Sequence, residues 1–445
     1  MSTRFSPTPA FAPARVVAVD LVTGSVTDPD EKPVDATDYR RIRALASLGT
    51  IPIVLTTLRV SDGDDEEQIV DQCRKATWDE ARDRIVSAFE AHGLETPASA
   101  QDIARFATAS PTTHDSPLIS ATICTLNNNK AAIRTAERIA NCTYSNFEIL
   151  IVDNSDSPNP LADKVADHFA SDPRVRHVHE PNRGLSNARN RGWTAAKGDI
   201  VVFTDDDVLV SPAWLSSIAD AFASADHVGC VTGPIIPAEI ETPAQDLLEQ
   251  YGGYNKGFSR QVFDNHRWRR DDILYPYNAG RFGSGANMAL SRKALETLNG
   301  FATELGAGTP THGGEDIDVL QRVISSGFAI VYEPSALMWH RHRRSYSQLR
   351  RQMYRYGIGL GATITKWTVE SRHHNFEVLR RFPKGFAYLL SPSSQKNNFK
   401  TSDYPRSLTA LELIGLILGP IAYFRSRQAL RHGQGATKAA PATRK

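Results

Sequence analysis

Between residues 118 and 232 the sequence alternates between short apolar runs and segments whose apolar side chains have helical spacing. The apolar runs are LISATICTL, FEILIVDNSD, RVRHVHE, DIVVFTDDD and HVGCVTG, and the helical segments include NKAAIRTAERIAN, LSNARNRGWTAAKG and SPAWLSSIADAFASA. Strands separated by helices of this length are typical of a parallel sheet that is covered on both faces. We therefore expect an α/β domain with a Rossmann-like, mostly parallel sheet in three layers.

Carboxylates end two of these strands. Asp153 follows FEILIV, and Asp205, Asp206 and Asp207 follow VVFT. Because ligands bind at the carboxyl ends of the strands in such sheets, we expect these residues to share one cleft. Two like charges about 4 Å apart cost about 1 kcal/mol in water and roughly 4 kcal/mol at a protein surface. A divalent cation would offset this repulsion, and Mg²⁺ or Mn²⁺ takes oxygen ligands; a solvated acidic turn is the alternative.

Two further segments offer groups that suit a nucleotide. Asp153 could accept a hydrogen bond from a ribose hydroxyl or a base, although an Asx turn would also explain it. In NRGLSNARNRG, Asn182 and Gly184 suit a turn that leads into a helix. Ser186 and Arg189 would then face a phosphate at the helix start, where backbone amides favour anions. An ordinary capped surface helix is the alternative.

The second half of this region holds three more motifs. A Gly-rich loop in 277–291 allows the backbone to approach a sugar or diphosphate closely, unless it is only a tight turn. Glu315 and Asp316 begin a predicted helix, where the dipole favours carboxylates and where one of them could act as a general base. His340 follows a strand and could ligate a metal as neutral imidazole.

Taken in order, these motifs resemble the family-2 glycosyltransferases of the GT-A fold, of the bacterial type. The matching stretches lie within about 118–345 and are TICTLNN, EILIVDNSD, EPNRGLSNARNRG, GDIVVFTDDDV, FGSGANMALSR, GGEDIDVLQR and YEPSALMWHRHRRS. The resemblance implies an inverting transfer of a sugar from a UDP-, dTDP- or GDP-sugar to an acceptor hydroxyl. The acceptor would be a carbohydrate, a lipid-linked group or a small molecule, in cell-envelope glycan, glycolipid or secondary glycoside synthesis.

The resemblance also implies roles for single residues. Asp316, beside Glu315, would be the catalytic base, and Mn²⁺ or Mg²⁺ would be held by Asp205, Asp207 and His340. The residues expected to bind the donor are Thr125, Asn127, Asp153, Asn182, Gly184, Arg189, Asp205 and Asp206. For the acceptor we expect Gly285 together with Tyr254 and Trp268, whose rings could stack on a sugar or simply pack.

The remaining segments flank this core. We expect a flexible leader at 1–14, a small N-terminal α+β module at 15–110, a linker at 110–117, a C-terminal helical extension at 346–430 and a disordered tail at 431–445. In the extension, LTALELIGLILGPIAYF is the most apolar stretch of the chain. It has 17 residues where a spanning helix needs about 20. A packed or interfacial helix is therefore favoured over a membrane span.

Net charge and residue composition limit the classes of partner and the compartment that we expect for this chain. A net charge of +1 argues against a nucleic-acid binder, which is usually strongly basic. A local basic cluster follows His340 and could neutralise a diphosphate or contact an anionic membrane surface, or form a solvated helix; it comprises Arg341, His342, Arg343, Arg344, Arg350, Arg351 and Arg355. Four scattered cysteines and a start without an apolar signal predict a cytoplasmic protein, either free or peripheral at the inner face of the plasma membrane.

Two other functions remain open at this point. A sugar-nucleotide nucleotidyltransferase also uses a parallel sheet and metal-binding aspartates, but TICTLNN lacks the Gly-rich loop that usually follows its first strand. A non-catalytic sugar-nucleotide-binding module is the second alternative. The presence of Asp205, Asp207, Asp316 and His340 together argues against it.

Overall fold

A computed structural model describes residues 11–34, 40–61, 64–106, 116–156, 160–370, 372–391, 394, 396–397 and 399–438. Most of the predicted leader and of the predicted linker lies outside these residues, as do the last residues of the predicted tail.

The N-terminal module is a small sheet backed by one long helix. Its strands lie in the order β2-β1-β3-β4. The elements are β1 (Arg15–Asp20), β2 (Val26–Thr27), β3 (Arg41–Leu48), β4 (Ile51–Arg59), α1 (Glu66–Ala91) and the 3₁₀-helix η1 (Ala100–Arg105). Helix α1 begins with a capping box, in which Asp65 and Gln68 satisfy each other's backbone N–H groups. Apolar side chains of α1 and of the sheet form the module's own core.

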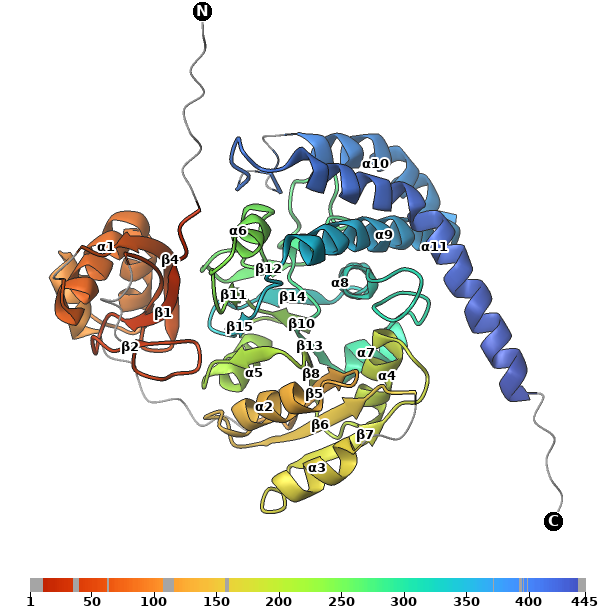
Figure 1. The fold of residues 1–445 in the computed structure, drawn as a ribbon, viewed down its shortest axis with the longest axis horizontal. Coiled ribbons are helices and arrows are strands. Elements are labelled where there is room, and N and C mark those ends of the chain that lie inside the picture. The colour runs from red at the N-terminus through yellow and green to blue at the C-terminus, as the bar shows by residue number, and fades with distance from the viewer. Residues whose placement is uncertain are drawn as a thin grey trace, which may run out of the picture.

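The core domain is built on a mixed sheet, which has eight strands in the described part of the chain (Figure 1). In spatial order they are β12 (Gln261–Phe263), β14 (Ala329–Tyr332), β10 (Val228–Thr232), β13 (Asn287–Ser291), β8 (Ile200–Asp205), β5 (Ile119–Thr125), β6 (Phe147–Asp153) and β7 (Val175–His179). Strands β12 and β13 run antiparallel to their neighbours, and the others share one direction. The predicted mostly parallel sheet is therefore confirmed.

Helices cover both faces of this sheet. On one face, apolar residues pack from α2 (Asn129–Ala140), α3 (Leu161–His168) and α5 (Trp214–Ala223). On the other, they pack from α4 (Leu185–Ala195), α7 (Arg292–Leu298) and α8 (Glu315–Ser325). Strands β5 and β6 are buried along their whole length, as expected for central strands between two helical layers. The three-layer prediction is confirmed as well.

A second, three-stranded sheet lies at the edge of the core domain, in the order β11-β15-β9. Its strands are β11 (Ile235–Pro237), β15 (Met338–His340) and β9 (Val208–Val210). In its antiparallel register His340 pairs with Val208. This pairing brings the end of β15 to the aspartates that directly precede β9.

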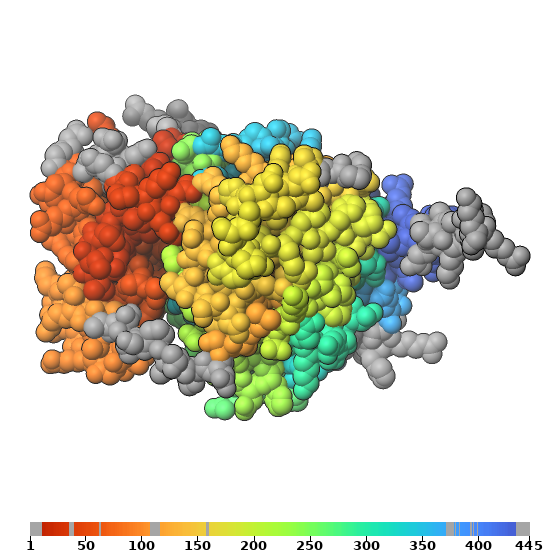
Figure 2. Space-filling model, turned by 90° about the horizontal axis from the view of Figure 1, so that it is seen from below, coloured from red at the N-terminus to blue at the C-terminus, as the bar shows by residue number. Residues whose placement is uncertain are grey.

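The N-terminal module packs against this small sheet (Figures 1 and 2). Val16 and Leu45 of the module share an apolar cluster with Leu209 and Trp339 of the small sheet. Nearby, the carboxylate of Asp30 meets the guanidinium groups of Arg134, Arg138 and Arg341. The module thus supports the sheet that presents His340, although its sequence showed no chemistry of its own.

Three helices follow the core domain: α9 (Tyr346–Glu370), α10 (Arg372–Leu390) and α11 (Arg406–Lys438). Helices α9 and α11 approach each other through glycines, and a Cβ atom on Gly419 would lie only 2.5 Å from backbone atoms of Gly361. On its other side α9 contacts the residues before α8, where Thr363 Oγ1 donates a hydrogen bond to the Gly314 carbonyl at 3.1 Å. Backbones of α11, α9 and the start of α8 are therefore stacked in direct contact.

Helix α11 extends further than we expected. It continues to Lys438, whereas the sequence predicted disorder from 431, and Figure 1 shows its last turns projecting from the body of the protein. Residues 431–438, RHGQGATK, include two glycines, so helix propensity does not explain this extension; the segment continues a helix that is already formed by the preceding turns. In the described part of the chain, Arg406–His432 is long and apolar enough to cross a membrane, by length and composition only; 39% of its apolar window is buried.

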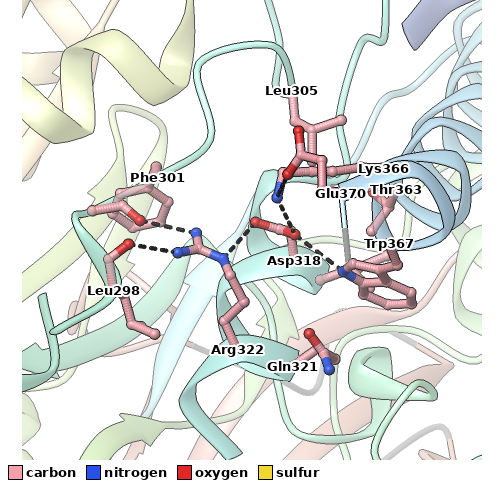
Figure 3. Close-up of polar contacts among 12 residues, drawn as sticks. Leu298, Phe301, Leu305, Asp318, Gln321, Arg322, Thr363, Lys366, Trp367 and Glu370 are labelled. Atoms are coloured by element: carbon pink, nitrogen blue, oxygen red, sulfur yellow. Dashed lines mark hydrogen bonds and ion pairs between the residues drawn. The ribbon is translucent and has the colours of Figure 1, made fainter. Parts of the chain in front are cut away.

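A buried carboxylate holds α8 against α9 (Figure 3). Asp318 is fully buried and accepts hydrogen bonds from Arg322 Nε at 2.8 Å and from Trp367 Nε1 at 3.1 Å. The ammonium of Lys366 lies 3.3 Å from the same carboxylate. Arg322 also donates to the carbonyl oxygen of Leu298 at the end of α7. This network fixes the helix that begins with Glu315 and Asp316.

We expect Asp318→Ala to lower the free energy of unfolding by about 2–4 kcal/mol. The substitution removes the common acceptor of two cations and an indole N–H, and breaking a buried ion pair costs about 3–5 kcal/mol; partial exposure of Arg322 and Lys366 reduces this figure. Urea unfolding followed by circular dichroism measures the loss. Asp163→Ala, at an exposed position of α3, is the control. A loss below about 1 kcal/mol, the net value of one ordinary hydrogen bond, would contradict the assigned network.

Candidate active site

A cavity of about 120 Å³ lies at the carboxyl ends of the core strands. It collects many of the residues singled out in the sequence: Arg189, Asp205, Tyr254, Gly285, Glu315, Asp316 and His340. These come from six separate segments, so the fold assembles the site from positions far apart in the chain. Pockets for whole ligands usually enclose about 300–1,000 Å³. This cavity can therefore enclose only part of a large substrate.

The Gly-rich loop before β13 holds Asp316 in the cavity wall. The backbone N–H of Gly285 donates to Asp316 Oδ2 at 3.1 Å, and the N–H of Ile317 donates to Oδ1 at 2.8 Å. A Cβ atom at position 285 would lie 2.8 Å from the Cβ atom of Asp316. The close approach that glycine permits here is thus an approach to Asp316, where the sequence suggested a sugar or diphosphate.

The guanidinium of Arg189 is bound by other residues of the protein. Its Nη1 donates to Glu315 Oε1 at 2.8 Å, and its Nη2 donates to the Gly285 carbonyl at 3.0 Å. The side chains of Arg189 and Glu315 are only 3% and 7% exposed. Asp205 Oδ1 lies 3.9 Å from the same guanidinium. We predicted that Arg189 faces a phosphate. Its guanidinium instead forms a buried ion pair with the carboxylate of Glu315.

Arg189 engages only one of the two carboxylate oxygens of Glu315. The other oxygen, Oε2, is buried and has no hydrogen-bond partner among the described residues. Burial raises the pKa of Glu315 to about 7, the charge of Asp316 adds to this rise, and Arg189 opposes it. Asp316, beside Glu315, is the carboxylate that the backbone orients toward the cavity.

The three consecutive aspartates have different surroundings. Burial raises the pKa of Asp205, and the charge of Arg189 opposes that rise. Asp206 points toward β5, where it accepts hydrogen bonds from Thr125 Oγ1 at 2.5 Å and Asn128 Nδ2 at 3.3 Å. Burial raises its pKa to about 6. Asp207 faces the small sheet, so the three carboxylates are separated and their repulsion is reduced.

Asp207 and His340 form the part of the site that suits a metal ion. Their Oδ1 and Nε2 atoms are 3.4 Å apart. Burial alone would raise the pKa of Asp207, but the hydrogen bond and charge of His340 hold it below its usual range. Conversely, burial would lower the pKa of His340, and Asp207 raises it. Carboxylate oxygen and neutral imidazole are both ligands for divalent metals.

Within the described ranges, no three His, Cys, Asp or Glu side chains are arranged as a complete metal site. Asp205 nevertheless interacts electrostatically with both Asp207 and His340. The donor set therefore fits a cation that takes most of its ligands from a substrate, as Mg²⁺ and Mn²⁺ do with phosphate oxygens.

The other expected donor residues lie along the same sheet edge but outside the cavity. Strand register places Thr125 beside Asp153, and Cys124 beside Asp205, in one row of strand ends. Asn127 is exposed just after β5. The strand ends thus share one edge, but of the four aspartates expected in one cleft only Asp205 lines the cavity. Among the acceptor residues, Tyr254 lines the cavity, whereas Trp268 does not and stacks with Arg267.

Asp153 forms the turn that we had considered as an alternative. Its Oδ1 accepts a hydrogen bond from the backbone N–H of Ser155 at 3.0 Å, and its side chain is almost fully buried. The neighbouring Asn154, which sequence reasoning missed, donates to the carbonyl of Asn182 and accepts from the N–H of Gly184. Asn154 thus fixes the turn before α4. The run DNSD, rich in turn formers, was its only local signal.

Comparisons with known proteins agree with this architecture. Residues 120–298 match the sequence model of the family described as "Glycosyl transferase family 2". A glucosyl-dolichyl phosphate glucuronosyltransferase of Haloferax volcanii is 24% identical over 228 residues, which are 50% of this chain and 69% of the relative. A pre-mycofactocin glycosyltransferase of Mycobacterium tuberculosis is 28% identical over 202 residues, 45% of this chain and 38% of the relative.

A solved structure also overlaps with this chain. It is the mannosyltransferase PcManGT from Pyrobaculum calidifontis, in complex with GDP-Man and Mn²⁺. It is 17% identical, with a TM-score of 0.41, and the match covers 73% of this chain and 76% of that chain. The matched family region, 120–298, includes the strand ends and the three aspartates, while Asp316 and His340 lie beyond it. The family match and the named relatives agree with the resemblance seen in the motifs: residues 120–298 of this chain are similar to glycosyl transferase family 2.

Proposed function

We propose that this protein is a metal-dependent, inverting glycosyltransferase. It would move a sugar from a UDP-, dTDP- or GDP-sugar to a hydroxyl group of an acceptor. The observation that carries the proposal is the convergence of Asp316, Asp205 and His340 on one cavity at the strand ends. A candidate base and a candidate metal site then line the same cavity. Displacement at the anomeric carbon requires both groups to act on one sugar.

Asp316 is the residue that best suits the general base. Two backbone N–H groups orient its carboxylate toward the cavity, and its neighbour Glu315 is committed to Arg189. Asp316 would accept the proton of the acceptor hydroxyl while that oxygen attacks the anomeric carbon. The bond to the nucleoside diphosphate breaks on the opposite side, and the configuration inverts.

Asp205, Asp207 and His340 are the residues that would hold Mn²⁺ or Mg²⁺. When bound, such an ion supplies positive charge to the leaving diphosphate. Arg343 contributes positive charge at Asp207 from the segment after β15. Thr125, Asp153 and the turn around Asn182 would contact the nucleoside along the row of strand ends.

A membrane surface is the location that the C-terminal helices favour. One face of α11 leaves five large apolar side chains exposed at helical spacing: Ile414, Ile417, Leu418, Ile421 and Phe424. The side chain of Ile417 is 71% exposed. Exposed arginines 406, 425 and 431 flank this apolar row and would pair with anionic headgroups. We therefore propose peripheral attachment to an anionic bilayer, which would also bring a lipid-linked acceptor to the cavity.

We expect Asp316→Asn to lower the transfer rate about 10²–10⁴-fold, because an amide cannot accept the hydroxyl proton. Donor affinity should stay at the wild-type value, since the side chain keeps its size. Nucleotide release from UDP-, dTDP- and GDP-sugars with Mn²⁺ measures the rate, and titration calorimetry measures the affinity. Asp163→Asn on the surface of α3 is the control. A rate near wild type would show that the base is another group.

Asp207→Ala should instead abolish the Mn²⁺-dependent part of donor binding. The substitution removes the carboxylate that faces His340, and chelation of metal from the wild-type protein should have the same effect. Calorimetric titration of the same donor sugars, with and without Mn²⁺, provides the measurement. Asp163→Ala should behave as wild type. An affinity that Asp207→Ala leaves unchanged would rule out the metal role, and turnover dependent on pyrophosphate would identify a nucleotidyltransferase.

Vesicle sedimentation tests the membrane proposal. Wild type should bind vesicles that contain anionic phosphatidylglycerol more strongly than vesicles of phosphatidylcholine alone. Ile417→Glu with Ile421→Glu should lose this binding, while Ile417→Leu with Ile421→Leu should keep it, because only the first pair removes the apolar surface. If the glutamate pair instead converts a dimer to a monomer in size-exclusion chromatography, a second copy of the chain covers the row.

A further inference from the structure

His340 is followed two residues later by a second histidine that contacts it directly. In an extended chain residues 340 and 342 point to the same side, and their Nδ1 atoms are 3.2 Å apart. The Nε2 atom of His342 in turn lies 2.9 Å from Glu249 Oε1, at the end of α6 (Pro243–Gln250). Asp207, His340, His342 and Glu249 therefore form one continuous chain of polar contacts.

His342 is enclosed, so its contacts within this chain decide where its proton lies. Its side chain is 0% exposed. Its backbone carbonyl accepts a hydrogen bond from Gln245 Nε2 at 3.3 Å, which ties the strand to α6. The ring of Tyr254 packs against both histidines, at 6.4 Å from the centroid of His340 and 6.0 Å from that of His342. The sequence grouped His342 with a basic cluster that could meet a diphosphate or a membrane; the structure instead buries it against Glu249.

We infer that His342 and Glu249 select the tautomer of His340 that can ligate a metal ion. The inference rests on the proposed function, in which His340 is a metal ligand, and it makes His342 a positioning residue. A neutral imidazole has one N–H donor and one bare nitrogen. Which nitrogen of a metal-ligating histidine is bare depends on the hydrogen bond that the other nitrogen makes.

With a cation bound at Nε2 of His340 both rings are neutral, and the geometry leaves one consistent arrangement of their protons. The Glu249 carboxylate is an acceptor, so Nε2 of His342 carries the proton and donates to it. Nδ1 of His342 is then bare and must accept a proton from Nδ1 of His340. Nε2 of His340 is consequently bare, and a cation between it and Asp207 Oδ1 satisfies both acceptors; without a cation, a proton on Nε2 takes that place and hydrogen-bonds to Asp207.

The opposite arrangement is disfavoured by the same contacts. With its proton on Nε2, a neutral His340 would need a donor at Nδ1 of His342. A neutral His342 would then present a bare Nε2 to the Glu249 carboxylate, and two acceptors would face each other at 2.9 Å. The chain of contacts therefore holds His340 in the form that offers its Nε2 lone pair to a cation at Asp207.

Metal binding by the full-length protein tests this inference without measuring activity. Mn²⁺ is titrated in the presence of inorganic pyrophosphate, and free Mn²⁺ is followed by electron paramagnetic resonance. His342→Leu removes the acceptor and should weaken Mn²⁺ binding about 10–100-fold, the usual effect of removing a partner of a metal ligand. His342→Asn places a carboxamide oxygen where Nδ1 stood and should keep an affinity close to wild type.

The outcomes separate this inference from the proposed function. If wild type does not bind Mn²⁺, both are overturned; if wild type binds and Asp207→Ala does not, the metal site stands. In that case an unchanged affinity of His342→Leu, with a wild-type melting temperature, overturns the role of His342. An equal loss in His342→Leu and His342→Asn also overturns it, because the imidazole would then matter only for its shape.

Discussion

The buried ion pair between Arg189 and Glu315 is the interaction on which the rest of the site depends. It joins residues 126 positions apart in the sequence, and the same guanidinium also binds the loop that contains Gly285. A buried pair of this kind adds little net stability, but removing one partner leaves an uncompensated charge. Here the ion pair serves to position the segments around it. It fixes α4, the Gly285 loop and the start of α8 relative to one another, and Asp316 takes its direction from that arrangement.

The buried network around Asp318 also supports the site. Asp318 follows the Glu315–Asp316 pair within one helical turn and takes part in the network with Arg322 and Trp367 (Figure 3). One helix thus serves two purposes: Glu315 and Asp316 at its start line the cavity, and Asp318 anchors it. His340, a proposed metal ligand, is supported in a similar way, since the N-terminal module packs against the sheet that carries it. In both places the support comes from segments outside the matched family region.

Much of this could be predicted from the sequence because it depends on local patterns. The period of apolar residues identified the strands that end at Asp153 and Asp205, and parallel topology put those ends on one edge. What could not be predicted depends on partners distant in the chain. No local pattern shows that Arg189 meets Glu315, that Asn154 fixes the turn at Gly184, or that Glu249 reaches His342. The antiparallel insertion of β13 between β8 and β10 likewise follows from topology alone.

The glycine contacts among α11, α9 and the start of α8 have a mechanical consequence. Flexible side chains normally absorb small shifts between packed helices, but here backbone meets backbone at Gly361 and Gly419, and Thr363 bonds to the carbonyl just before Glu315. The three segments therefore form one rigid unit. Its outer end is the apolar face of α11, and its inner end is the start of α8, which carries the proposed base Asp316. The orientation in which the protein rests on a surface would set the direction from which an acceptor hydroxyl reaches Asp316.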